Sequence, residues 1–325
     1  MSKVEKLFTV FDETAQILAD ECSYTYLEAL AETGENLFQQ SVLQKDIGDE
    51  AARKLLEKYE SVNLGEYSKE EIRKSFQLAL LKGMRDSVQP NHQMTPDTVG
   101  LLIGYLVGKF VKDSSLRIFD PAVGTGNLLT TVANQQEGKE LMLIGSEVDD
   151  LLIKLAYVNA NLQQTPVELF HQDSLQPLLV DPVDVVVCDL PVGYYPDDER
   201  AKEYRLKADE GHSYAHHLLI EQSINHTKPA GYLFFLIPNG LFESPEAPKL
   251  RDYLKDEVHI QSVISLPRTM FKNEKAAKSI FILQKKGPET KAPKQVLLVE
   301  FPSLSNMGEV ENILRKIDAW IKENK

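Results

Sequence analysis

The sequence predicts an α/β protein in which a mostly parallel sheet, covered by helices on both faces, follows an N-terminal helical domain. The first 89 residues show only helical periodicity and contain no proline, whereas short β-branched runs alternate with helical stretches after Pro90. Such alternation is typical of βαβ units, whose parallel strands carry helices above and below. With 325 residues and 42% apolar side chains, the chain is long enough to form two domains with a substantial core.

The N-terminal segment has apolar side chains at the spacing of amphipathic helices. Examples are Ala15, Leu18, Ala19, Cys22 and Tyr26, followed later by Ile72, Phe76, Leu80 and Met84. Gly34 and the stretch 63–65 are expected to interrupt these helices. Because no chemically distinctive motif occurs here, we interpret residues 1–89 as a packing or dimerising domain. The second domain is expected to span residues 90–325.

Seven β-branched runs after Pro90 are expected to form the strands of the sheet. They are residues 116–120, 141–148, 167–171, 183–189, 231–238, 259–266 and 279–284. Helical patterns fall between most of them, for example at 98–110, 151–162 and 215–226. An eighth short run at 296–299 and an amphipathic helix at 310–321 close the chain. The mixed-charge stretch 197–210 is expected to form a mobile, solvated flap.

The composition excludes several classes of protein. With 36 Lys+Arg against 49 Asp+Glu, the formal charge is −13, which argues against binding nucleic acid through bulk charge. Only the stretch 268–286, which is rich in lysine, suits phosphate binding. The two cysteines, Cys22 and Cys188, cannot form a disulfide framework or a cysteine-based metal site. No apolar run reaches the roughly 20 residues that span a bilayer, and the N-terminus lacks the features of a signal peptide. We therefore expect a cytoplasmic protein with no membrane partner.

A glycine-containing loop follows the first expected strand. Asp120, Gly124 and Gly126 lie in the segment Asp-Pro-Ala-Val-Gly-Thr-Gly, just before a helical pattern. Glycines allow the backbone to pass close to a ligand, and ligands of open α/β sheets bind outside the carboxyl ends of the strands. The segment is not a phosphate loop, because no Lys-Ser/Thr follows the second glycine, and it lacks the third glycine of a dinucleotide fingerprint.

The next three strands also end in carboxylates. Glu147 ends the second expected strand, Asp173 follows the third, and Asp189 ends the fourth. A carboxylate at the end of the second strand suits a ribose, because it can accept hydrogen bonds from both hydroxyls of the diol. Four consecutive strands that deliver carboxylates to one edge of the sheet predict a binding site.

Taken together, these residues resemble the class I S-adenosylmethionine-dependent methyltransferases. The resemblance points to the adenine-amino DNA methyltransferases and, among them, to the modification subunits of type I restriction systems. It covers about residues 90–290. The motifs that carry it are Gln93-Met-Thr-Pro96, the loop 120–126, Glu147, Asp173, the segment 231–242, the segment 263–267 with Phe271, and the segment 278–283.

This resemblance implies a seven-stranded Rossmann-like methyltransferase sheet and S-adenosylmethionine as the cofactor. It also assigns the residues that bind this cofactor. They are Thr95 and Pro96 at its methionine end, Asp120, Ala122, Gly124 and Gly126 in the glycine loop, Glu147 at the ribose, and Asp173 with Ser174 at the adenine ring.

The catalytic tetrapeptide of the family is Asn/Asp-Pro-Pro-Tyr/Phe, and the matching residues here are Asp189, Leu190, Pro191 and Val192. In the family, the first side chain and the following carbonyl accept hydrogen bonds from the target amine and orient its lone pair toward the methyl group. Leu190 replaces the first proline, and Val192 replaces the aromatic residue that stacks on a flipped base. Asp189 and Pro191 are therefore predicted to present the acceptor, with Tyr194 or Tyr195 as the substitute aromatic.

The resemblance implies DNA as the partner, but the chain lacks a target-recognition region and other nucleic-acid-binding motifs. Selectivity would then come from a partner protein, from the stretch 268–286 or from the N-terminal helices, which are also candidates for a homodimer interface. Two alternatives stay open: methylation of RNA adenines or protein amides, and a catalytically silent, cofactor-binding regulatory or interaction protein. His212, His216 and His217 do not form a metal motif, and no metal site is expected.

Overall fold

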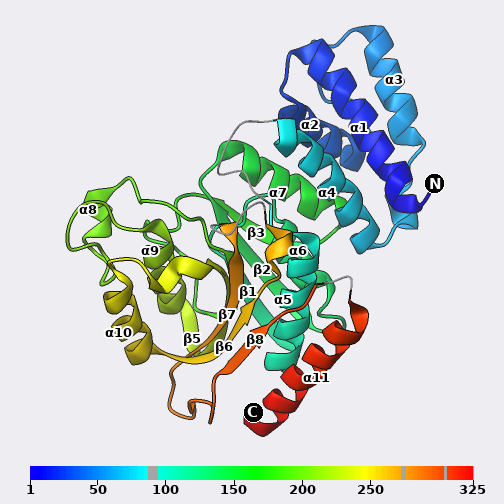
Figure 1. The fold of residues 1–325 in the computed structure, drawn as a ribbon. Coiled ribbons are helices and arrows are strands. Elements are labelled where there is room, and N and C mark those ends of the chain that lie inside the picture. Colours follow the sequence, from blue (N-terminus) through cyan, green and yellow to red (C-terminus); the bar gives the residue numbers. More distant parts are fainter. Residues whose placement is uncertain (87–93, 272–275, 304–305, 325) are drawn as a thin grey trace.

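The computed structural model describes residues 1–86, 94–271, 276–303 and 306–324. It combines an N-terminal helical unit with a central sheet that carries helices on both faces (Figure 1). The predicted fold class, an α/β sheet preceded by a helical domain, is confirmed. Within the described ranges, no helix is both long and apolar enough to cross a membrane.

Four helices form the N-terminal helical unit: α1 (Lys3–Cys22), α2 (Tyr26–Gln39), α3 (Asp49–Glu60) and α4 (Lys69–Asp86). The first two each begin with a capping box, in which Ser2 or Thr25 and a glutamate three residues later satisfy each other's backbone amides. The core of this unit continues onto α7 (Asp150–Leu162) through Leu155, Val158 and Leu162. The helical unit is thereby packed directly against a helix of the sheet domain.

Gly34 lies inside α2 and does not interrupt it, so that expectation is wrong. A Cβ atom on Gly34 would lie only 2.2 Å from Cγ1 of Val158. The glycine therefore permits the close approach of α2 to α7 rather than a turn. The stretch 63–65 does separate two helices, because the 3-10 turn η1 (Leu64–Glu66) lies between α3 and α4.

The sheet contains eight strands in the order β3-β2-β1-β4-β5-β7-β6-β8. They are β1 (Ser115–Asp120), β2 (Glu140–Glu147), β3 (Val167–His171), β4 (Val183–Asp189), β5 (Thr227–Pro238), β6 (Val258–Ser265), β7 (Lys278–Lys285) and β8 (Leu297–Glu300). β7 runs antiparallel to β5 and β6, and the other neighbours are parallel. The predicted strand 296–299 joins the sheet beside β6 as β8, so the count of seven strands is corrected to eight.

Besides α7, which packs on β2 and β3, the helices that cover the sheet are α5 (Asp97–Phe110), α6 (Asn127–Asn134), α9 (Ala215–Asn225), α10 (Ala247–Glu257) and α11 (Met307–Asn324). Alternate side chains of each strand enter opposite apolar layers, as period-2 geometry requires. In β1, Ile118 enters the layer shared with α5, α6 and α11, whereas Phe119 enters the layer shared with α9 and α10. Figure 1 shows these two groups of helices on opposite sides of the sheet.

The segment 197–210, expected to form a mobile, solvated flap, is anchored to the core at a few positions, although most of its charged side chains are exposed. It begins with α8 (Asp198–Ala201), and Ala201, Tyr204 and Leu206 are all buried in the layer beneath α9. The Tyr204 hydroxyl donates a hydrogen bond of 2.7 Å to the Leu175 carbonyl, and Glu221 accepts two backbone amides of the segment. These few apolar residues are inconspicuous in a stretch dominated by charged side chains.

Candidate functional site

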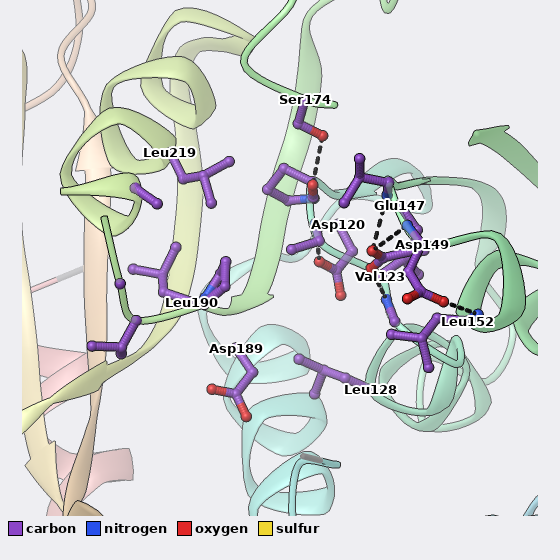
Figure 2. Close-up of a pocket in the computed structure, with 18 of the residues that line it drawn as sticks. Asp120, Val123, Leu128, Glu147, Asp149, Leu152, Ser174, Asp189, Leu190 and Leu219 are labelled. Atoms are coloured by element: carbon purple, nitrogen blue, oxygen red, sulfur yellow. Dashed lines mark hydrogen bonds between the residues drawn. The ribbon is translucent and has the colours of Figure 1, made fainter. Parts of the chain in front are cut away.

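A cavity of about 720 Å³ lies at the carboxyl ends of β1–β4. This is where the chain order of the sheet reverses, between β1 and β4, and open α/β sheets bind ligands at such a point. Eleven of the thirteen predicted site residues line it: Thr95, Asp120, Ala122, Gly124, Glu147, Asp173, Ser174, Asp189, Pro191, Tyr194 and Tyr195. Figure 2 shows the strand-end carboxylates Asp120, Glu147 and Asp189 around this cavity.

The other two predicted residues, Pro96 and Gly126, do not line the cavity but directly precede the helices α5 and α6. Pro96 is the residue before α5, and its carbonyl accepts the amides of Val99 and Gly100. Gly126 has a positive φ of 74°, and a Cβ atom there would lie 3.4 Å from the α7 backbone at Ala156. Both residues therefore shape the backbone that carries the site.

The glycine loop is open toward the cavity at Gly124. This residue has a φ of 54°, and a Cβ atom built on it would meet no other atom within 4 Å. Its backbone N–H donates to Oε2 of Glu147 at 2.9 Å, and the Val123 N–H donates to the Ser146 carbonyl at 2.9 Å. The loop after β1 is thus fastened to the end of β2 and leaves room for a ligand to approach its backbone.

The Glu147 carboxylate is held in place by three backbone amides. Besides Gly124, the amides of Val148 and Asp149 donate to its Oε1 atom at 2.9 and 3.1 Å. A carboxylate has about four lone-pair directions, so acceptor capacity remains for about one hydroxyl group of a ligand. Asp149 is itself occupied, because its side chain caps α7 by accepting the amides of Leu151 and Leu152.

Asp120 is the most strongly perturbed carboxylate at the cavity. Its side chain is 1% exposed and accepts one backbone hydrogen bond, from Ala122 at 3.1 Å. Burial, together with the nearby carboxylates of Glu147 and Asp189, raises the pKa of Asp120 to about 7, against the opposing effect of the hydrogen bonds from Ala122 and the Cys188 thiol. A cationic or hydrogen-bond-donating group of a ligand would stabilise the ionised form of this buried carboxylate.

Asp173 and Ser174, which follow β3, form hydrogen bonds to the glycine loop and to Tyr195. The Ser174 hydroxyl donates to the Pro121 carbonyl at 2.5 Å. Asp173 accepts the Leu175 amide at 2.9 Å and the Tyr195 hydroxyl at 2.5 Å. Tyr195 is only 5% exposed, and burial together with the Asp173 carboxylate raises its pKa. Tyr195 therefore supports Asp173 and does not offer a ring face to an acceptor.

The Asp189 carboxylate is held between two side chains. The Thr95 hydroxyl donates to Oδ2 at 2.9 Å, and the Lys278 ammonium donates to Oδ1 at 2.5 Å. Thr95 thus connects the segment before α5 to the end of β4. The sequence analysis placed Lys278 in the basic stretch 268–286 and at the start of the segment 278–283, but it did not predict that Lys278 pairs with Asp189.

Tyr194 presents an exposed aromatic ring at the mouth of the cavity. Its side chain is 64% exposed and stacks on Tyr214, with ring centroids 5.1 Å apart and an interplanar angle of 16°. By contrast, Val192, which replaces the aromatic residue of the tetrapeptide, is exposed and has no ring, and Leu190, which replaces the first proline, is buried. Tyr214, which the sequence analysis did not select, is the partner that holds Tyr194 in place.

The basic stretch 268–286 does not form one phosphate-binding surface among its described residues. Lys278 lies in the cavity, whereas Lys285 is at the other end of β7, roughly 24 Å away at the rise of an extended strand. Lys285 and Lys286 are bound to backbone carbonyls at that far end. Lys272 and Lys275 lie outside the described residues.

The three histidines of the segment 212–217 have different surroundings. His212 pairs with Asp198 at 2.9 Å, whereas His216 and His217 are buried in α9. Burial lowers the pKa of each buried histidine to about 4, which keeps both imidazoles neutral. Across the described ranges, no group of three or more His, Cys, Asp or Glu side chains is arranged to hold a metal ion.

The strand order with an antiparallel β7, and the glycine loop followed by strand-end carboxylates, define an S-adenosylmethionine-dependent methyltransferase fold. S-adenosylmethionine is the cofactor of this class. The chain belongs to the N-6 DNA methylase family, whose model matches residues 91–321. Residues 5–84 match the YtxK N-terminal helical domain.

Individual relatives agree with this assignment. The protein YtxK of Bacillus subtilis (strain 168) is 52% identical over 324 residues, which cover 99% of this chain and 98% of that protein. The crystal structure of a Listeria monocytogenes protein assigned to the class I S-adenosylmethionine-dependent methyltransferases is 50% identical. It superimposes with a TM-score of 0.93 over 98% of this chain and 99% of its own.

A type I restriction-modification methyltransferase subunit from Streptococcus thermophilus shares the fold at 18% identity. The TM-score is 0.67, and the match covers 96% of this chain and 74% of that subunit. The resemblance to modification subunits therefore holds at the level of the fold.

Proposed function

We propose that this methyltransferase transfers the methyl group of S-adenosylmethionine to the exocyclic amine of adenine in DNA. The observation that carries the proposal is the position of Asp189, whose carboxylate lines the same cavity as the glycine loop and Glu147. A cofactor over the loop and an acceptor beside Asp189 would then share one cavity. Methyl transfer needs this proximity, since two aligned reactants convert a bimolecular step into an effectively unimolecular one.

The residues at the cavity fit the proposed cofactor. Glu147 has remaining acceptor capacity for a hydroxyl of the ribose, and Gly124 leaves space beside its backbone. Asp173 is an acceptor for the exocyclic amine of the cofactor's adenine. Asp120 is a buried carboxylate with a single backbone donor, which suits the ammonium group at the methionine end. When bound, S-adenosylmethionine supplies a methyl group activated by its positively charged sulfur.

Asp189 would present the acceptor. Thr95 and Lys278 fix its carboxylate, and each oxygen retains capacity to accept an N–H bond from the target amine. Such a bond orients the nitrogen lone pair and stabilises the positive charge that develops on nitrogen. Pro191 would shape the turn beside it, and Tyr194 would offer a ring on which a planar base can stack.

The test is the methylation of genomic DNA in cells with the intact gene, without it, and with an Asp189→Ala copy. Single-molecule sequencing reads N6-methyladenine in each. We expect a methylated motif that disappears both on deletion and in the Asp189→Ala strain. Unchanged methylation in all three strains would reject DNA as the acceptor.

A second candidate is a cofactor-binding protein without turnover, and the Lys278–Asp189 contact favours it. The Lys278 ammonium is paired with the carboxylate that would bind the acceptor, and Val192 stands where the family has its stacking ring. This candidate predicts that the purified protein binds S-adenosylmethionine in calorimetry but labels no DNA, RNA or lysate protein. Transfer to RNA or protein, but not to DNA, would instead indicate one of these acceptors.

A further inference from the structure

A buried arginine of the N-terminal helical unit reaches the helices that flank the glycine loop. Arg73 lies on α4, and its side chain is 0% exposed. Its Nη1 atom donates to Oδ1 of Asn127 at 2.8 Å, and its Nη2 atom donates to Oδ1 of Asp97 at 2.5 Å. Glu70 on the same helix accepts from Nε at 2.8 Å and from Nη2 at 2.6 Å. The guanidinium is therefore fully engaged, as a buried charge requires.

Both acceptors outside α4 are the first residues of helices that carry the site. Asp97 begins α5, two residues after Thr95, and Asn127 begins α6, directly after Gly126. Neither helix has a side-chain cap, because Pro96 and Gly126 occupy the cap positions. Side chains at the starts of these helices bind Arg73 instead, so a residue of the helical unit fixes two helix starts that border the cavity.

A second set of polar contacts runs from the same helix to the loop backbone. Glu70 accepts from Asn134 at 3.5 Å, Asn134 donates to Gln163 at 3.0 Å, and Gln163 donates to Asn159 at 2.8 Å. Asn159 then donates to the carbonyl of Thr125, between the two loop glycines, at 3.2 Å. Asn159 and Gln163 are each 1% exposed. Buried polar networks of this kind hold their members in a unique arrangement when all are satisfied.

We propose that Arg73 is a positioning residue for the cofactor site, through which the N-terminal helical unit sets the conformation of the glycine loop and the affinity for S-adenosylmethionine. The loop needs such support, because its two glycines at positive φ gain the most backbone freedom when released. The inference rests on the proposed placement of the cofactor over this loop. It makes the helical unit part of the cofactor site and not only a separate packing module.

The test compares Arg73→Met with Leu30→Ala, which creates a cavity in the core of the helical unit without touching the network. Calorimetry gives the dissociation constant for S-adenosylmethionine, and hydrogen–deuterium exchange of the cofactor-free protein gives the protection of residues 121–134. We expect Arg73→Met to raise the dissociation constant at least tenfold and to speed exchange in the loop. Leu30→Ala should lower the unfolding midpoint while leaving both loop readouts near wild type.

Arg73→Lys keeps the charge but loses the planar fork that serves several acceptors. It should give a dissociation constant between those of the wild type and Arg73→Met. If Arg73→Met does not fold, Asp97→Ala decides, because it removes one acceptor and leaves the Arg73–Glu70 pair. We then expect a several-fold weaker affinity and faster loop exchange.

The inference would be overturned if a folded Arg73→Met protein kept the affinity and the loop exchange of the wild type. If Arg73→Met does not fold, the same result in Asp97→Ala would overturn it. An equal loss of affinity in Leu30→Ala would also overturn it, since general destabilisation would then suffice. Failure of the wild type itself to bind S-adenosylmethionine would instead refute the placement of the cofactor over the loop. The two failures are therefore distinguishable.

Discussion

At the scale of single residues, the adjacent tyrosines of the acceptor loop have different surroundings and should have different roles. The Tyr195 hydroxyl binds Asp173, whereas the Tyr194 ring stacks on Tyr214 at the cavity mouth. A hydrogen bond to a charged group contributes about 1.5–3 kcal/mol. Tyr195→Phe is therefore expected to raise the dissociation constant for S-adenosylmethionine by about tenfold.

Tyr204→Phe is the matched control, because it removes a hydroxyl bound to the Leu175 carbonyl and not to Asp173. Its cofactor affinity should stay within about twofold of the wild type, given that a neutral hydrogen bond contributes little at a distance from the ligand. Tyr194→Ala should also preserve cofactor affinity but raise the KM for the acceptor. A loss of cofactor affinity in Tyr194→Ala equal to that in Tyr195→Phe would contradict this division of roles.

Asp120 should make cofactor binding depend on pH near neutrality. Its pKa is raised to about 7 by burial, so the cofactor-free site is increasingly protonated below that pH. Because the ionised carboxylate is the form that attracts an ammonium group, affinity for S-adenosylmethionine should weaken as the pH falls from 8 to 6. Calorimetry across this range should show the dependence in the wild type and a flatter profile in Asp120→Asn.

The same carboxylate should destabilise the cofactor-free protein. The native state holds this proton up to about pH 7, whereas the unfolded chain releases it near 3.8, so the contribution of Asp120 to the unfolding free energy falls as the pH rises between these values. Asp120→Asn should raise the unfolding free energy at pH 8 by about 1–3 kcal/mol. Urea denaturation measures this, with the exposed Asp181→Asn as the control. A less stable Asp120→Asn protein would contradict the assignment.

At the scale of secondary-structure elements, the contact between α2 and α7 depends on Gly34. A methyl group there would overlap Val158, so Gly34→Ala should lower the unfolding free energy by about 1–3 kcal/mol despite the higher helix propensity of alanine. Gly308→Ala in α11 is the control, because its Cβ has room and the change should be neutral or stabilising. Adding Val158→Ala should relieve the clash of Gly34→Ala, and a double-mutant cycle that shows no coupling would contradict the packing explanation.

The positions of the strands could be predicted from the sequence better than the packing between helices and the buried side-chain contacts. β4 agrees with the predicted 183–189 because a buried parallel strand is rich in β-branched residues. β3 also agrees with the predicted 167–171, although it is an edge strand with no fully buried residue. Gly34 was misinterpreted because a glycine that breaks a helix and a glycine that packs inside one look alike in sequence. The anchoring of 197–210 and the pairing of Lys278 with Asp189 depend on tertiary contacts that no local pattern encodes.

At the scale of the whole molecule, the site is assembled from parts far apart in the chain. Thr95, Asp189 and Lys278 meet from three separate parts of the chain, and Arg73 of the helical unit binds the start of the helix that follows the glycine loop. Eleven of the cavity residues could be predicted, because nine lie at or next to strand ends or in an ordered family motif, and Tyr194 and Tyr195 follow the altered tetrapeptide closely. The sequence could not assign the roles of Arg73, Lys278 or Tyr214, because these follow from the way the helices and the sheet come together.

We propose above all that this protein transfers a methyl group to adenine in DNA. The most direct measurement incubates the purified protein with tritiated S-adenosylmethionine and unmethylated DNA, and identifies the labelled base after digestion. We predict label in N6-methyladenine with the wild type and none with Asp189→Ala, which should still bind the cofactor. Cofactor binding by the wild type without label in DNA would contradict the claim and leave RNA, a protein amide or a silent methyltransferase fold.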